Sequence, residues 1–135
     1  MRIVTLIMLI AVLLGLVACL CFWPHATSAP ARQMTTRGTL FSLHHAVIQF
    51  KMDTGRYPTG EEGLRVLIEE PAGVTGWNDG GYLDTAEIPR DSWGREFVFI
   101  LKPEERIPFI IMSYGADGAP GGEGDDADLS STDWH

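Results

Sequence analysis

Residues 3–23 form an uncharged, apolar stretch of 21 residues that contains a single hydroxyl side chain, Thr5, and a single glycine, Gly15. A helix rises about 1.5 Å per residue, so this stretch spans roughly 30 Å, the thickness of the hydrocarbon core of a bilayer. We therefore predict a transmembrane anchor in residues 1–24 and a folded domain in residues 25–135.

Two processing routes compete with a retained membrane helix. Residues 27–29 (Thr-Ser-Ala) are a passable signal-peptidase site, although the apolar stretch is long for a cleaved signal. Residues 16–19 (Leu-Val-Ala-Cys) match a lipobox in which Cys19 is lipidated. Because the residues after Cys19 remain apolar, the retained helix is the preferred interpretation, with Cys19 and Cys21 as small apolar side chains.

The charge of the chain excludes one class of partner. It carries 10 basic and 18 acidic residues, a formal net charge of −8. Nucleic-acid binding requires a basic surface that neutralises phosphates, so we expect no nucleic-acid partner. Both cysteines lie in the apolar stretch, and the folded domain therefore has no disulfide and no thiolate metal site.

Two helices are predicted in the first half of the folded domain. Apolar residues recur at spacings of three and four between Thr35 and Asp53, which is the pattern of an amphipathic helix. Gly55 and Pro58 end this helix. Thr59 and Glu62 then have the spacing of a capping box, which predicts a short second helix. The buried stripes consist of Leu40, Leu43, Val47 and Phe50 in the first helix, and Leu64, Leu67 and Ile68 in the second.

The sequence of the second half of the folded domain predicts a long loop followed by a β-hairpin. Residues 72–90 are rich in Gly, Asp and Pro, whereas residues 96–101 and 108–113 are aromatic and β-branched. A polar turn at residues 102–106 joins these two strands. The expected fold class is α+β, with the long helix packed on a small antiparallel sheet.

The region after the second strand is acidic and rich in glycine. Six acids follow Ser113, and no Lys or Arg follows Arg106. Glycine lets the backbone fold back so that carbonyl and carboxylate oxygens converge, and hard oxygen donors without Cys or His suit calcium. The spacing of the acids is not that of an EF-hand loop. A disordered acidic tail is the alternative interpretation.

Taken together, several segments of the folded domain resemble the major pseudopilin of type II secretion systems. They cover most of residues 40–134, and their combination is specific although each alone is weak. The matching segments are residues 50–59 (FKMDTGRYPT), 62–64 (EGL), 80–83 (GGYL), 89–94 (PRDSWG), 113–118 (SYGADG) and 121–129 (GGEGDDADL).

The resemblance implies a fold, a function and a metal site. Members of this family are single-pass inner-membrane subunits whose N-terminal helices pack in the core of a periplasmic fibre, the pseudopilus, that supports protein export across the outer membrane. Their globular heads bind calcium in the C-terminal loop. The ligands implied here are the side chains of Asp117, Asp126 and Asp128 and the backbone carbonyls of Tyr114 and Ala119, and Asp125 is an alternative to one of the carboxylates.

The N-terminal segment departs from the family pattern. Pseudopilins carry a short leader and then a glutamate within the apolar stretch, but here Leu6 stands at the glutamate position and the first acid is Asp53. Two functions therefore compete. The first is a subunit that assembles with its own copies, with other pseudopilins and with the secretion machinery. The second is a membrane-anchored, calcium-binding module that does not polymerise and holds a partner in the envelope.

We expect no enzymatic activity. His44 and His45 are adjacent on the predicted helix and therefore point about 100° apart, which does not make a metal pair. Ser, His and Asp residues occur without the spacing of a nucleophile elbow. Trp77, Tyr82 and Trp93 could form a sugar-binding surface, but anchoring of the core and loops is the more common use of such residues.

Overall fold

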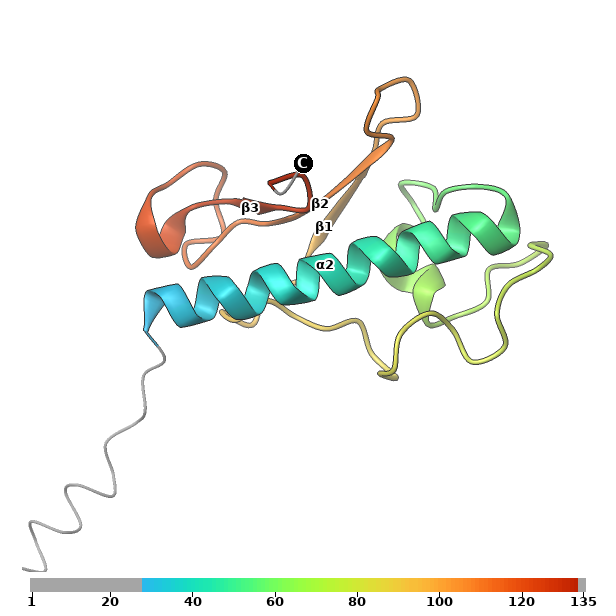
Figure 1. The fold of residues 1–135 in the computed structure, drawn as a ribbon, viewed down its shortest axis with the longest axis horizontal. Coiled ribbons are helices and arrows are strands. Elements are labelled where there is room, and N and C mark those ends of the chain that lie inside the picture. Colours follow the sequence, from blue (N-terminus) through green and yellow to red (C-terminus); the bar gives the residue numbers. More distant parts are fainter. Residues whose placement is uncertain (1–27, 134–135) are drawn as a thin grey trace, which may run out of the picture.

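The computed structural model describes residues 28–133. The predicted anchor in residues 1–24 and the first three residues of the predicted domain lie outside this range. No helix within residues 28–133 combines the length and apolar character needed to cross a membrane. The described chain is one long helix that lies along a small sheet, with loops extending beyond both (Figure 1).

The long helix, α2, runs from Ala29 to Thr54. It begins earlier than the predicted Thr35, because Pro30 occupies the first turn, where a proline is tolerated, and the Ser28 carbonyl accepts hydrogen bonds from the first turn. Gly55 ends it with a left-handed conformation (φ 80°) and donates its N–H to the Lys51 carbonyl. The predicted stripe is confirmed: Leu40, Leu43, Val47 and Phe50 are all 0% exposed.

A three-stranded antiparallel sheet packs against α2. It contains β1 (Val98–Leu101), β2 (Phe109–Ser113) and β3 (Leu129–Ser130), in that spatial order. The predicted hairpin is therefore confirmed, whereas the short β3 was not predicted. Its two residues are too few to show alternation in the sequence, and β2 provides the register by pairing Met112 with Ser130.

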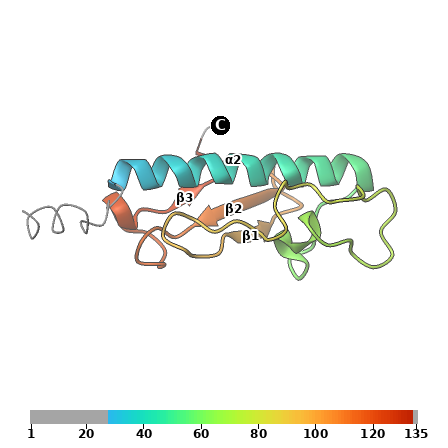
Figure 2. The same ribbon diagram turned by 90° about the horizontal axis from the view of Figure 1, so that it is seen from below.

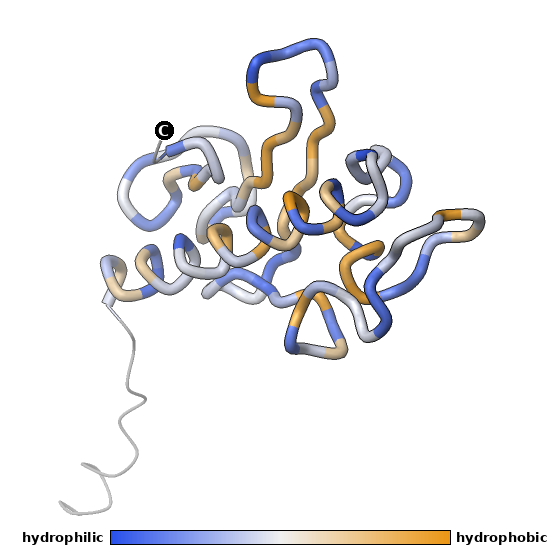
Figure 3. The backbone as a smooth tube through the Cα atoms, turned by 45° about the vertical axis from the view of Figure 1, so that its right-hand side comes forward, coloured by the Kyte–Doolittle hydropathy of each residue, from blue (hydrophilic) through white to orange (hydrophobic). Residues whose placement is uncertain are grey.

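The hydrophobic core lies between α2 and the sheet. Residues of β2 alternate, and those facing α2 are buried. Figure 2 shows α2 running along one side of the sheet, and Figure 3 shows apolar hairpin strands that end in a hydrophilic tip. The core also receives side chains from the short helix and from β3. Its buried members outside α2 are Leu64, Val66, Leu67, Phe97, Phe109, Ile111 and Leu129.

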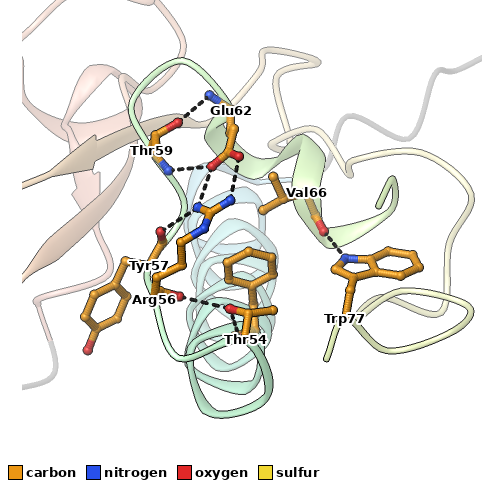
Figure 4. Close-up of polar contacts among 8 residues, drawn as sticks. Thr54, Arg56, Tyr57, Thr59, Glu62, Val66 and Trp77 are labelled. Atoms are coloured by element: carbon orange, nitrogen blue, oxygen red, sulfur yellow. Dashed lines mark hydrogen bonds and ion pairs between the residues drawn. The ribbon is translucent and has the colours of Figure 1, made fainter. Parts of the chain in front are cut away.

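The predicted second helix is present as a 3₁₀ helix, η1 (Gly63–Leu67), preceded by the capping box. Thr59 N donates to Glu62 Oε2 at 2.9 Å, and Glu62 N donates to Thr59 Oγ1 at 3.2 Å. The two terminal guanidinium nitrogens of Arg56, Nη1 and Nη2, also donate to the Glu62 carboxylate, each at 2.7 Å (Figure 4). The hydrogen bond from Arg56 is the main reason that the pKa of Glu62 falls to about 2.

Two aromatic residues anchor the long loop to η1. Trp77 Nε1 donates to the Val66 carbonyl at 2.8 Å (Figure 4), and the Tyr82 N–H donates to the Leu67 carbonyl at 2.7 Å. Their rings meet edge to face, 6.1 Å apart. Trp77 and Tyr82 therefore fasten the loop to the core, which is the anchoring use expected from the sequence.

Candidate metal centre

The acidic loop connects β2 to β3 and folds back on itself. Its first half, residues 114–119, lies against its second half, residues 121–128, which includes the 3₁₀ helix η2 (Gly124–Asp126). The Ala116 N–H donates to the Asp125 carbonyl at 2.9 Å and joins the two halves. The structure therefore contains the folded loop predicted from the sequence rather than the alternative, a disordered acidic tail.

Two glycines allow the halves of the loop to approach closely. Gly115 and Gly122 have φ values of 62° and 84°, which disfavour other residues. A Cβ on Gly115 would lie 2.8 Å from the Asp126 carbonyl oxygen, and one on Gly122 would lie 2.5 Å from the same oxygen. The Asp126 backbone therefore packs closely against Gly115 and Gly122, which have no side chains.

The first half of the loop contributes three of the predicted ligand residues. The Tyr114 carbonyl accepts a hydrogen bond from Gly118 N at 3.1 Å, which closes a turn. Within this turn, Asp117 is exposed, and its Oδ1 accepts from Ala119 N at 3.0 Å. The side chain of Asp117 thus stabilises the turn that presents the carbonyl of Ala119.

The second half contributes three predicted carboxylates with different surroundings. Asp126 is exposed, while Asp125 and Asp128 are half-buried. Asp128 Oδ2 accepts from Gly121 N at 2.9 Å, and its buried Oδ1 has no hydrogen-bond partner within residues 28–133. Asp125 Oδ2 binds Arg32 Nη2 at 2.9 Å, and its Oδ1 is likewise buried and without a hydrogen bond in the described chain.

The donor chemistry of the loop fits calcium, although the carboxylates are spread out. Within residues 28–133, no three His, Cys, Asp or Glu side chains are grouped closely enough to hold a metal ion. The unsatisfied oxygen of Asp128 nevertheless carries a cost, because a buried carboxylate oxygen without a partner is unfavourable. A hard cation would satisfy that oxygen and could also take the carbonyl oxygens of the loop.

Contacts from α2 that no sequence pattern indicates hold this loop in place. Besides the Arg32–Asp125 ion pair, Gln33 Nε2 donates to the Gly124 carbonyl. Arg95 also donates to the Ala116 carbonyl. Arg32 and Asp125 are separated by 93 positions in the chain, and no local pattern signals such a contact.

Comparison with known proteins identifies the family of this chain. The family model described as "Type II secretion system (T2SS), protein G" matches residues 25–132. This chain belongs to that family. The type II secretion system core protein G of Pseudomonas aeruginosa is 35% identical over 132 residues, covering 94% of this chain and 90% of the relative. The protein of the same name from Vibrio cholerae is 30% identical, covering 93% and 86%.

A solved structure supports the same conclusion at the level of the fold. The crystal structure of the major pseudopilin of the type 2 secretion system of enterohaemorrhagic Escherichia coli aligns with a TM-score of 0.61 at 28% identity. The alignment covers 75% of this chain and 86% of that one. The resemblance expected from the sequence is confirmed, and this protein G family member is a structural subunit of a type II secretion pseudopilus.

Proposed function

We propose that this subunit is anchored by residues 3–23 as a single-pass protein of the inner membrane, with its globular domain in the periplasm. The observation that carries the proposal is the position of α2, which begins at Ala29, shortly after the apolar stretch ends. The domain packs on α2, so an anchor that precedes this helix leaves the domain outside the bilayer. The partners we propose are further copies, other pseudopilins and the secretion machinery. The role is structural, without catalysis.

Polymerisation can be tested against the non-polymerising alternative by cysteine crosslinking. Met34 lies on α2 and is 77% exposed, so Met34→Cys places a thiol near the predicted anchor without disturbing the core. Cys19→Ala and Cys21→Ala remove the native thiols. Because one thiol per subunit can give no more than a covalent dimer, Met52→Cys is added at a second position of α2 that is 76% exposed, and a ladder of crosslinked species in native membranes then supports a fibre. Monomers alone, under conditions where the thiols react with maleimide, would support the anchored module that holds a different envelope partner.

We further propose that the acidic loop binds one calcium ion. Asp117, Asp126 and Asp128 would supply carboxylates, and Tyr114 and Ala119 would supply carbonyls. The support comes from the oxygen donors and the buried Oδ1 of Asp128. We expect an affinity on the order of 10⁻⁴ to 10⁻³ M, as in other extracellular modules. Bound calcium would stabilise only the folded loop and would therefore raise the melting temperature.

The calcium proposal is tested by melting the protein in calcium and in chelator. Asp128→Asn and Asp117→Ala should each remove the difference between the two melting temperatures. Asp84→Asn is a matched control, because Asp84 is exposed and lies outside the acidic loop. If both loop variants respond to calcium as strongly as the control does, the assignment is wrong.

A further inference from the structure

The outer edge of β1 has no neighbouring strand within residues 28–133, because β1 stands first in the sheet order β1, β2, β3 (Figure 2). Phe99 lies opposite Ile111. The Ile111 N–H and carbonyl both face β3, where they bond Ser131 Oγ at 3.0 Å and Ser131 N at 2.8 Å. Backbone groups alternate in direction along a strand, so the N–H and carbonyl of Phe99, and those of Leu101, point away from β2. No turn, loop or side chain within residues 28–133 forms a hydrogen bond with them.

A cavity of about 660 Å³, which we call the edge trough, opens beside this edge. Three segments give it an apolar lining: Phe97 and Phe99 come from β1 and the residue before it, Leu64 and Ile68 from η1 and its end, and Ile88 from the long loop. Ile68, Ile88 and Phe99 are only half-buried. Partly uncovered apolar side chains beside unpaired backbone groups are what a sheet edge offers to an additional strand.

The edge trough is also acidic. Five glutamates and two arginines line it, an excess of three carboxylates. Three of the glutamates form ion pairs, with Arg56, Arg65 and Arg90. Glu61, which precedes η1, and Glu87, in the long loop, are exposed and form no ion pair within residues 28–133. Both segments that flank β1 therefore carry a carboxylate able to receive a cationic side chain.

We propose that the edge trough binds an extended, basic segment of a partner protein as an additional strand beside β1. The main chain of Phe99 and Leu101 pairs with the segment, and apolar side chains of the segment pack on Phe97 and Phe99. Its Lys or Arg side chains meet Glu61 and Glu87. A second copy of this chain is a poor electrostatic match, because each copy carries a net charge of −8. No residue of α2 or of the acidic loop lines the edge trough, so this binding requires neither polymerisation nor calcium.

Hydrogen exchange of the full-length protein in lipid nanodiscs tests the strand pairing. The probe is a peptide of alternating lysine and valine, roughly six residues long as strands usually are. At saturation it should slow exchange of the Phe99 and Leu101 amides by about tenfold or more, because pairing removes them from water. The Ile100 amide faces β2 and should not change. Absence of protection at Phe99 and Leu101, or equal protection by a peptide of alternating glutamate and valine, would overturn the proposal.

Backbone methylation of the probe separates strand addition from simple attraction between charges. In an added strand, alternate residues point their N–H groups towards β1 and away from it. Two versions of the peptide are compared, one methylated on the nitrogen of every valine and the other on the nitrogen of every lysine. One version should lose its protection of Phe99 and the other should keep it. Equal behaviour of the two versions would contradict pairing with β1.

Charge variants test the acidic lining. Glu61→Gln and Glu87→Gln should each weaken binding of the lysine peptide about threefold, as expected for an exposed ion pair. Glu104→Gln is the matched control, because Glu104 is exposed, forms no ion pair within residues 28–133 and does not line the edge trough. Equal weakening in all three variants would mean that net charge alone attracts the peptide, which would overturn the proposed contacts.

The same exchange measurement, made before any peptide is added, distinguishes the other possible occupant. In the proposal, the Phe99 and Leu101 amides exchange faster than the Ile100 amide, because they have no partner. Slow exchange at Phe99 and Leu101 that becomes fast when the protein is diluted would mean that a second copy already fills the edge trough. That result would also overturn the proposal.

Discussion

Ser113 at the end of β2 donates a 2.6 Å hydrogen bond from its Oγ to Oδ2 of Asp91. Both residues are buried, with exposed fractions of 0% and 6%. The other oxygen of Asp91 accepts from Trp93 N at 3.0 Å and from Arg95 N at 2.8 Å. One carboxylate therefore joins the turn at residues 91–95 to the point where the acidic loop leaves the sheet.

Replacing Asp91 should destabilise the domain strongly. Asp91→Ala leaves two backbone N–H groups and the Ser113 hydroxyl without their acceptor, and we expect a loss of about 2–3 kcal/mol in the free energy of unfolding. Asp91→Asn keeps one carbonyl oxygen and should cost less. Urea denaturation followed by circular dichroism measures both. An Asp91→Ala variant as stable as the wild type would show that the buried carboxylate contributes nothing net.

Much of this fold follows from local sequence patterns. The spacing from Leu40 to Phe50 predicts α2, and the Thr59–Glu62 pair predicts the capping box, because both depend on neighbours three or four positions apart. The start of α2 was predicted too late, since Thr35 and Thr36 interrupt the apolar pattern. In the structure, Thr36 Oγ1 forms a hydrogen bond with Ser92 Oγ at 3.0 Å. These residues are far apart in the sequence, and no local pattern indicates their contact.

The acidic loop was predictable in location and only partly in detail. Its composition indicates a loop that folds back on itself, and the structure contains such a loop, although its carboxylates are spread out. The partner of Asp125 was not predictable from the sequence. Arg32 lies near the opposite end of the domain's sequence, and it reaches the loop only when α2 packs on the sheet. Long-range ion pairs of this kind depend on the tertiary arrangement rather than on local spacing.

The Arg56–Glu62 ion pair should make stability depend on pH in acid. The pKa of Glu62 is lowered from its ordinary value of 4.5 to about 2, so the folded state holds the charged form more firmly than the unfolded state does. This contribution is complete above about pH 4.5 and is lost as the pH falls towards 2. Glu62→Gln should flatten the dependence in this window, as measured by urea denaturation at successive pH values.

A nearby glutamate provides the control for this experiment. Glu69 faces Arg65 at 3.7 Å, and its side chain is 62% exposed, so solvent screens the pair. Glu69→Gln should leave the acid dependence close to that of the wild type. Equal flattening in the two variants would mean that general charge reduction, rather than the Arg56 contact, produces the effect of Glu62→Gln.

The close approach at Asp126 should make Gly122 much less tolerant of substitution than Gly121. Both glycines have positive φ values, 84° and 98°, so alanine strains the backbone at either position. Only at Gly122 does a Cβ also meet the Asp126 carbonyl oxygen, whereas nothing lies within 4 Å of one at Gly121. Thermal melts should therefore show a larger loss for Gly122→Ala. Equal losses would indicate that the loop opens without cost.

The Arg32–Asp125 ion pair leads to a prediction about which carboxylates serve the metal. Asp125 Oδ2 is bound to Arg32, and both side chains are 29% exposed, so the pair should contribute about 0.5–1 kcal/mol to stability. If Asp125 mainly links the loop to α2, then Asp125→Asn and Arg32→Gln should weaken calcium binding to the same small extent, by loosening the loop. Asp128→Asn should weaken it by a larger factor, because Asp128 has a buried oxygen without a partner and, unlike Asp125, forms no ion pair within residues 28–133. Terbium luminescence titrations of the three variants would separate these roles. Equal, severe losses for Asp125→Asn and Asp128→Asn, with a mild effect of Arg32→Gln, would instead make Asp125 a ligand.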